Sequence, residues 1–316
     1  EIFLRLTKQN LTNFELRFGY YKSEFDQKII TNNCFYEPFS VHYLESKEFK
    51  FKRESNSLGL SDVEPELKYS DDDFLIIGLG DSFTEGDGAH QDSTWLKFLE
   101  YNLVGKDSVN YKSINAGICG SDPFYSLRLF EDKLLQYNPD LVILTIGSDL
   151  EDIILRGGMD RFERKTPRLK APKWELVYQH SFIFRRMYHS YNNKYPLFLN
   201  ESTFEKEKER AEEELKELLL YFEDLSEENG FELLIVFYPV SVEIRNESYN
   251  HWNELIMFCK YSNIEYLNLL KYYLLEGGIN QNNVSEFFWK SDGHHNAKGY
   301  EKFAEGVLWK LQQMEF

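Results

Sequence analysis

Residues 74–86 read Phe74-Leu75-Ile76-Ile77-Gly78-Leu79-Gly80-Asp81-Ser82-Phe83-Thr84-Glu85-Gly86. The first six residues form a short apolar run bounded by turn residues, which predicts a buried strand of a parallel sheet. Ser82 follows at a strand-to-helix turn, where its hydroxyl would lie at the edge of the sheet and its backbone N–H could help to hold an oxyanion. The turn differs from the G-x-S-x-G elbow of α/β-hydrolases because Thr84 replaces the second glycine. Taken alone, Asp81 or Ser82 capping a helix explains the stretch equally well.

Predicted strands and helices alternate outward from this stretch. Further strands are expected at residues 113–115, 141–146, 231–237 and 264–269, and helices at about 93–104, 124–137, 203–229, 249–262 and 297–312. This alternation predicts an α/β protein, a three-layer sandwich in which helices cover both faces of a central parallel sheet. Ligands of such sheets bind beyond the carboxyl ends of the strands, so the residues that follow each strand are the candidates for a site.

The alternation begins near residue 71 and divides the chain into two predicted parts. Residues 1–70 hold short alternating runs, and we expect an N-terminal extension that packs on the main domain. Residues 71–316 are expected to form that domain, with an insertion at about 151–200. Either the insertion shapes a pocket for an anionic or sugar-bearing substrate, or its arginines pair with surface carboxylates. These arginines are Arg156, Arg161, Arg164, Arg168, Arg185 and Arg186.

Two further segments follow predicted strands. Gly117 and Gly120 are spaced three apart, which permits a tight turn with a bare backbone N–H facing a cleft, although a plain turn also explains them. The segment Gly147-Ser148-Asp149 follows the strand at 141–146 and leads into more acidic residues. Acidic groups at a strand end can bind a divalent cation, but we favour helix capping over a metal site.

A histidine pair near the C-terminus, in Asp292-Gly293-His294-His295-Asn296, supplies a candidate base. An aspartate can accept the Nδ1–H of a nearby imidazole and leave its Nε2 facing a serine. Asn296 is a good N-cap for the helix expected at 297–312. A surface loop before a helix would explain either histidine alone, but it explains the cluster less well.

Together these four segments resemble the sequence blocks of the SGNH hydrolase superfamily, also called GDSL-like lipases and esterases, in that family's order. The resemblance covers about residues 73–150 and 230–312, and residues 56–62 look like the lead-in of envelope-associated bacterial members. It implies the flavodoxin-like SGNH hydrolase fold. It also implies a serine-dependent esterase that releases a short acyl group, such as O-acetyl on a glycan, through an acyl-serine intermediate.

The resemblance assigns the catalytic triad. Ser82 is the expected nucleophile and Asp292 the expected acidic member. The histidine of the family lies two residues before an asparagine, which selects His294 because Asn296 follows it. A literal Asp-x-x-His count selects His295 instead, so His295 stays open as the alternative base.

The resemblance also assigns an oxyanion hole made of the backbone N–H groups of Ser82 and Gly120 and the side chain of Ser148. Ser148 replaces the asparagine that is usual in the family, and a hydroxyl is a shorter donor than a carboxamide. Two other functions remain open. The same residues could serve an O-acyltransferase in which a sugar hydroxyl replaces water, or the chain could be a non-catalytic binding module on a degenerate SGNH scaffold.

Composition limits the partners. A formal net charge of −17 repels phosphate backbones and anionic lipid headgroups, so nucleic acid is not an expected partner. No apolar run approaches the roughly 20 residues that a membrane span needs. We expect a small-molecule or glycan ester as substrate, and neither a metal nor an organic cofactor is required. The oligomeric state stays open.

The cysteines and the start of the chain bear on its location. Cys34, Cys119 and Cys259 are odd in number and lack zinc-ligand spacing, so we interpret them as thiols while one disulfide stays open. The chain begins at Glu1 without a methionine. Removal of an upstream signal or anchor would explain this and would place the protein outside the cytoplasm, but the location stays open.

Overall fold

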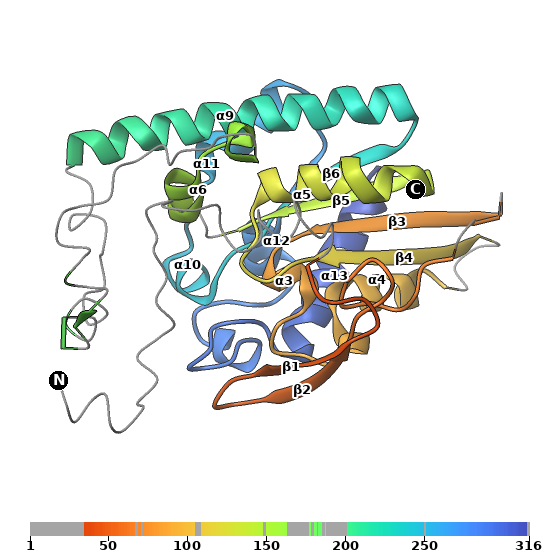
Figure 1. Cartoon of the computed structure of the whole chain (residues 1–316), viewed down its shortest axis with the longest axis horizontal. Helices are drawn as coiled ribbons and strands as arrows, with labels where there is room; N and C mark the ends of the chain where they lie inside the picture. The colour runs from red at the N-terminus through yellow and green to blue at the C-terminus, as the bar shows by residue number, and fades with distance from the viewer. Residues whose placement is uncertain are drawn as a thin grey trace. The chain divides into compact units, whose positions relative to one another are not determined.

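The computed structural model describes residues 35–66, 69–70, 72–104, 109–147, 150–162, 177, 180–181, 183–184, 187, 201–249 and 251–314. The chain forms two compact units. The first comprises Glu1–Gln27 and Leu150–Glu214, and the second comprises Lys28–Asp149 and Leu215–Phe316. The second unit contains the central sheet and is called the sheet unit below (Figure 1). The domain boundaries expected from the sequence stay a prediction.

Five parallel strands form the central sheet. They are β3 (Asp73–Gly80), β4 (Asn110–Gly117), β5 (Leu141–Ile146), β6 (Glu232–Phe237) and β7 (Tyr266–Asn268), and their order is β4-β3-β5-β6-β7. Numbered along the chain this order is 2-1-3-4-5, that of flavodoxin-like folds, whose ligands bind at the switch point between the first and third strands. The predicted α/β class with a central parallel sheet is confirmed, and the residues that follow β3 lie at that switch point.

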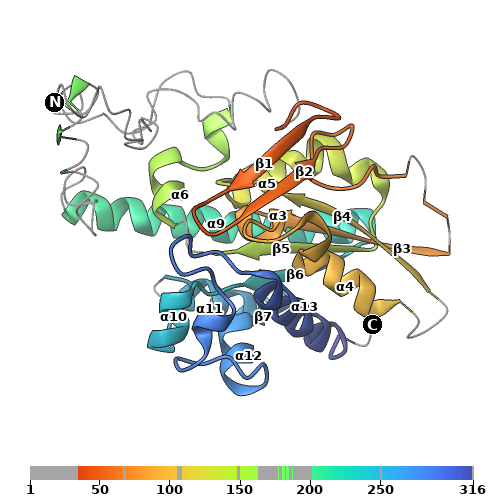
Figure 2. The ribbon, with the colours of Figure 1, turned by 90° about the horizontal axis from the view of Figure 1, so that it is seen from below.

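Helices cover both faces of the sheet (Figures 1 and 2). One layer contains α4 (Trp95–Leu103), α12 (Leu269–Leu275) and α13 (Ala297–Leu311), and the other contains α5 (Pro123–Leu129), its π-helical continuation (Phe130–Leu134) and part of α9 (Glu201–Asn229). In the first layer the ring of Trp95 stacks on Phe303 with centroids 5.1 Å apart. In the second layer the ring of Phe130 lies 5.8 Å from that of Phe222. These apolar contacts bury the sheet between the two layers.

Several elements differ from their expected spans. The strand expected at 113–115 is longer. A shorter helix, α11 (Asn253–Tyr261), lies within the span expected at 249–262, and the preceding helix α10 (Ser241–Asn246) was not predicted. The sequence reading missed α12, which begins directly after β7. Asn268 caps this helix, since its Oδ1 accepts a hydrogen bond from Lys271 N at 2.8 Å. The predicted cap of α13 is confirmed, because Asn296 Oδ1 accepts from Gly299 N at 3.1 Å.

Residues 35–66 belong to the sheet unit and contain an antiparallel hairpin of β1 (Val41–Glu45) and β2 (Lys50–Glu54). After the hairpin, the buried Asp62 accepts a hydrogen bond from Asn115 N of β4 at 2.7 Å. Burial is the largest influence on the pKa of Asp62 and raises it, although Lys97 opposes this shift. These contacts fasten the segment to the strand at the edge of the sheet.

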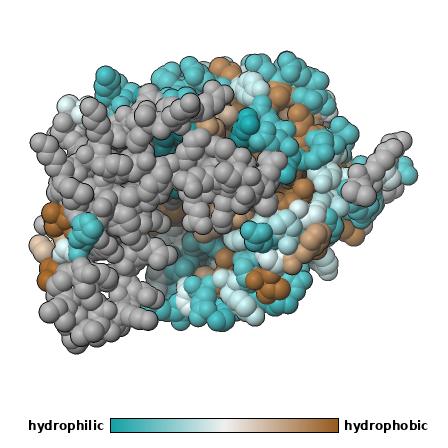
Figure 3. Space-filling model, viewed as in Figure 1, coloured by the Kyte–Doolittle hydropathy of each residue, from teal (hydrophilic) through white to brown (hydrophobic). Residues whose placement is uncertain are grey.

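Five further described elements are short. They are α6 (Leu150–Arg156) and the 3-10 turn Met159–Phe162 in the first unit, and the 3-10 turns Gln91–Ser93, Leu135–Tyr137 and Val284–Glu286 in the sheet unit. No helix among the described residues is long and apolar enough to cross a membrane. The described residues on the face seen in Figure 3 mix hydrophilic and hydrophobic side chains.

Candidate active site

Ser82 is the first residue of the four-residue helix α3 (Ser82–Glu85), which begins just after β3. Asp81 caps this helix, since its Oδ1 accepts a hydrogen bond from Phe83 N at 2.9 Å. The second oxygen of Asp81 accepts a hydrogen bond from the hydroxyl of Tyr238. The capping function therefore belongs to Asp81, and the hydroxyl of Ser82 has another partner.

That partner is His294. The Nε2 atom of His294 lies 2.8 Å from Ser82 Oγ, and its Nδ1 atom lies 2.6 Å from Asp292 Oδ1. Both distances are those of hydrogen bonds. Ser82 is largely buried, with 9% of its surface exposed. The structure thus brings these three residues together, with the imidazole of His294 between the Ser82 hydroxyl and the Asp292 carboxylate.

The surroundings of His294 favour its protonated form. Burial is the largest single influence and lowers its pKa, but the hydrogen bond to Asp292 and the charges of Asp87, Asp292 and Asp81 outweigh it, so the pKa is raised. The hydrogen bond from His294 lowers the pKa of Asp292 in return. Asp292 therefore stays ionised and can stabilise the imidazolium that forms when His294 accepts a proton.

His295 points away from Ser82 into the core. His295 is fully buried. Its Nδ1 lies 3.2 Å from the carbonyl oxygen of Phe287, and its Nε2 lies 3.4 Å from the hydroxyl of Tyr273. Burial lowers the pKa of His295 to about 3, so the ring is neutral. The structure does not bring this alternative base to Ser82.

The expected oxyanion donors are only partly described. Gly120 follows β4 with a φ of 73°, a conformation that favours glycine. At Gly117 a Cβ atom would lie 2.0 Å from the backbone nitrogen of Glu85, so only glycine lets the end of β4 lie this close to α3. Ser148 and Asp149 lie outside the described residues, as do Arg164, Arg168, Arg185 and Arg186 of the expected insertion.

Two buried carboxylates near Ser82, Glu85 and Asp87, were not predicted from the sequence. Glu85 accepts hydrogen bonds from the hydroxyl of Tyr36 at 2.8 Å and from Cys119 N at 2.6 Å. Asp87 Oδ2 lies 4.0 Å from His294 Nε2. Both residues follow Ser82 within five positions, so the acidic residues just after Ser82 could have indicated them from the sequence.

Burial raises the pKa of both carboxylates. It raises the pKa of Glu85 to about 7, with the nearby charge of Asp87 adding to the shift and that of Arg53 opposing it. Burial likewise raises the pKa of Asp87, which the charge of His294 opposes. Burial is also the main reason that the pKa of the Cys119 thiol is raised, which makes this thiol a poor nucleophile. The described part of the chain contains no group of three or more His, Cys, Asp or Glu residues that could hold a metal ion.

Comparison with protein-family models and with curated proteins finds no match to the sequence. Solved structures similar to this chain include the acetyl xylan esterase AlAXEase, at 15% identity, a TM-score of 0.47 and coverage of 74% of this chain and 98% of that one. Another is the psychrotrophic esterase EstA from Pseudoalteromonas sp., at 16% identity, a TM-score of 0.43 and coverage of 76% and 97%. Others are described as a G-D-S-L family lipolytic protein and a GDSL-like lipase. The names of these structures thus describe two esterases and two proteins of the GDSL type.

Proposed function

We propose that this chain is a serine-dependent esterase that hydrolyses short acyl esters, with Ser82 as nucleophile, His294 as base and Asp292 as its orienting carboxylate. One observation carries the proposal. The Ser82 hydroxyl, the His294 ring and the Asp292 carboxylate are joined by hydrogen-bond distances of 2.8 and 2.6 Å at the switch point of the sheet. A hydroxyl is a weak nucleophile until an adjacent base accepts its proton, and this arrangement supplies that base.

In the proposed reaction Ser82 Oγ attacks the ester carbonyl while its proton passes to His294 Nε2. The negative charge on the carbonyl oxygen is held by the backbone N–H groups of Ser82 and Gly120, with the Ser148 hydroxyl as a weaker donor. His294 then gives its proton to the departing alcohol, which leaves an acyl-serine. Water attacks that acyl group, His294 accepts the proton of the water, and the proton returns to Ser82 as the acid leaves.

A fluorophosphonate probe tests this proposal, since it forms a covalent bond only with an activated serine. We expect intact-mass and peptide analysis to find one adduct, on Ser82. Absence of an adduct from the folded protein would contradict the proposal and favour a binding module. Measuring acetyl release from a short-chain ester with and without a saccharide acceptor then separates hydrolysis from acyl transfer to a sugar.

Asp87→Asn is expected to move the pH dependence of kcat/KM. His294 must be neutral to accept a proton from Ser82, so activity rises as pH increases through its pKa. The charges near the His294 ring are those of Asp81, Asp87 and Asp292, and all raise that pKa. Removing the charge of Asp87 lowers the pKa, so the rising limb of the profile should move to lower pH. If the rising part of the pH profile stays at the same pH in a folded variant, Asp87 does not influence the pKa of His294.

Ser148 is proposed as a weakened oxyanion donor. Loss of a full donor costs roughly 10²- to 10³-fold in kcat, so Ser148→Ala should lower kcat by less than that and leave KM little changed. Ser148→Asn should raise kcat, because a carboxamide N–H reaches further than a hydroxyl. If neither substitution changes kcat while the melting temperature falls, Ser148 only caps the following turn and the oxyanion role is wrong.

A further inference from the structure

The proposed site depends on two backbone segments that are far apart in the sequence. One segment follows Ser82, and the other is the loop that carries Asp292 and His294, more than 200 positions later. Catalysis by a serine and a histidine needs both groups held in one geometry, because a displacement of about 1 Å can cost on the order of 10²-fold in rate. Something must therefore fix the two segments relative to each other.

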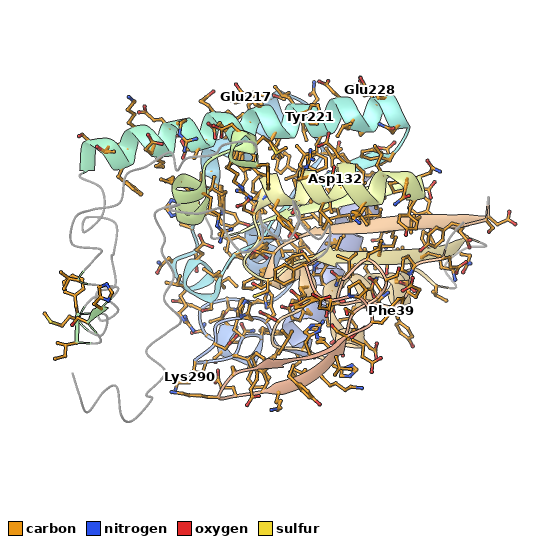
Figure 4. The ribbon with its side chains drawn as sticks, in the orientation of Figure 1. Phe39, Asp132, Glu217, Tyr221, Glu228 and Lys290 are labelled. Carbon is orange, nitrogen blue, oxygen red and sulfur yellow. The ribbon has the colours of Figure 1, made fainter. Side chains whose placement is uncertain are left out.

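The β1–β2 hairpin contacts the loop of the base through Glu48, which lies in the turn between the two strands. Its Oε1 accepts a hydrogen bond from Lys290 N at 3.1 Å, and its Oε2 accepts from Ser291 N at 2.7 Å and Asp292 N at 2.9 Å. Figure 4 labels Lys290, beside the end of the hairpin. Three consecutive N–H groups converge on one carboxylate, and such charge-assisted bonds are stronger than neutral ones.

The same hairpin contacts the segment after the nucleophile through Arg53 of β2. This side chain is buried, and its guanidinium donates to the carbonyl oxygens of Glu85 at 2.9 Å, Gly86 at 2.6 Å and Ala89 at 3.0 Å. The planar fork of arginine suits several acceptors at fixed positions, which lysine cannot reproduce. A fully buried cation is costly unless it is well paired, so its presence here ties the conformation of these carbonyls to the hairpin.

Aromatic contacts join the same parts. The ring of Phe49, next to Glu48, lies 5.5 Å from the ring of Trp289 at the start of the loop. The indole Nε1 of Trp289 donates to the carbonyl oxygen of Gly88 at 2.7 Å. The hairpin, the loop of the base and the segment after Ser82 are thus mutually connected.

We infer that Glu48 and Arg53 form a hairpin clamp, a pair of positioning residues that hold the Asp292–His294 loop and the Ser82 segment in register for catalysis. This inference rests on the proposed function for its effect on rate. Neither residue contacts the reacting atoms, so the clamp acts through the placement of Ser82 and His294. An element outside the sheet and its helices would then be part of the catalytic apparatus.

Glu48→Gln is the direct test, with Glu45→Gln as its matched control. Glu45 lies on the same hairpin and its carboxylate pairs with Lys50 Nζ at 2.5 Å on the surface. The number of active sites is first counted with the fluorophosphonate probe. We expect Glu48→Gln to lower kcat per counted site by about 10- to 100-fold with KM within about twofold, and Glu45→Gln to match the unaltered protein. An unchanged kcat per counted site with only a lower melting temperature would overturn the inference.

A double-substitution cycle separates positioning from general stability. If Glu48 acts through Asp292, then Glu48→Gln should have little further effect on kcat in the Asp292→Asn protein. If the losses in kcat of the two single variants multiply in the double variant, Glu48 does not act through Asp292. For the other half of the clamp, Arg53→Lys should slow labelling of Ser82 by about tenfold, whereas Lys52→Ala on the same strand should not. Equal labelling rates would remove Arg53 from the clamp.

A readout that needs no catalysis distinguishes failure of this inference from failure of the proposed function. The proton between His294 Nδ1 and Asp292 should give a downfield proton NMR resonance in the unaltered protein and in Glu45→Gln. Glu48→Gln should weaken or shift that resonance. A protein that shows this pattern but hydrolyses no ester would retain the clamp and lose the esterase proposal. A resonance that Glu48→Gln leaves unaltered would overturn the clamp.

Discussion

Ser82→Ala is expected to lower kcat for a short-chain aryl ester by roughly 10⁴- to 10⁶-fold, the loss typical of a removed triad nucleophile. Alanine lacks the oxygen that would form the acyl-serine, so no neighbouring group can take over the covalent step. The Ser82 hydroxyl forms a hydrogen bond with His294 Nε2 at 2.8 Å. Its removal should therefore cost about 1 kcal/mol of folding free energy, which leaves the protein folded.

Ser126→Ala is the matched control for this substitution. Ser126 is also buried, on α5, and its hydroxyl has no hydrogen-bond partner in the described structure. Its replacement should leave kcat and fluorophosphonate labelling unchanged, while Ser82→Ala should lose both. Far-ultraviolet circular dichroism and melting temperature establish that each variant is folded. Near-normal turnover in folded Ser82→Ala protein would remove Ser82 from the mechanism.

The sheet and the position of Ser82 at the turn after β3 could be predicted because both depend on local patterns. The run Phe74–Leu79 is apolar throughout, as expected of a strand covered on both faces, and the residue type after it suits a turn. β5 is predicted for the same reason, and all six of its residues are buried. The α12 helix was missed because its residues continue the apolar run of β7, and only the cap at Asn268 separates the two elements.

The residues that surround the proposed triad were harder to predict because their contacts are long-range. Lys50 and Lys52 alternate with Phe49 and Phe51, and this pattern predicts a strand but gives no reason to single out Arg53 as buried. Glu48 and Asp292 are 244 positions apart, and their contact depends on the folded path of both loops. The residue pattern within either segment does not indicate that Glu48 and Asp292 are in contact.

The choice between His294 and His295 also needed the structure. Both residues stand within three positions of Asp292, and either spacing permits a hydrogen bond. Gly293 has a φ of 94°, which favours glycine, and His295 forms a bridge with Phe288 just after it. Successive side chains of extended backbone point to opposite sides, so one imidazole faces Ser82 and the other enters the core.

Opposite effects are therefore expected from replacing the two histidines. His294→Ala removes the proposed base, and kcat should fall by roughly 10⁴- to 10⁶-fold. Loss of its hydrogen bonds to Ser82 and Asp292 should cost about 1–2 kcal/mol of folding free energy. His295→Ala removes a buried ring packed against Phe288 and Tyr300, with ring centroids 4.1 and 5.4 Å away. The cavity should cost about 2–5 kcal/mol of folding free energy.

Activity per active site separates the loss of a base from the loss of a fold. In His295→Ala and in His295→Phe, which refills the cavity, kcat per fluorophosphonate-counted site should stay within about tenfold of normal, because the neutral His295 ring has no contact with Ser82. In His294→Ala, added imidazole should restore part of the activity, since a free base can enter the space left beside the serine hydroxyl and accept its proton. Added imidazole should not change the activity of the His295 variants. If His295→Phe instead abolishes turnover in a folded protein, and His294→Ala keeps it, the base is His295 and the Asp292–His294 pair is structural.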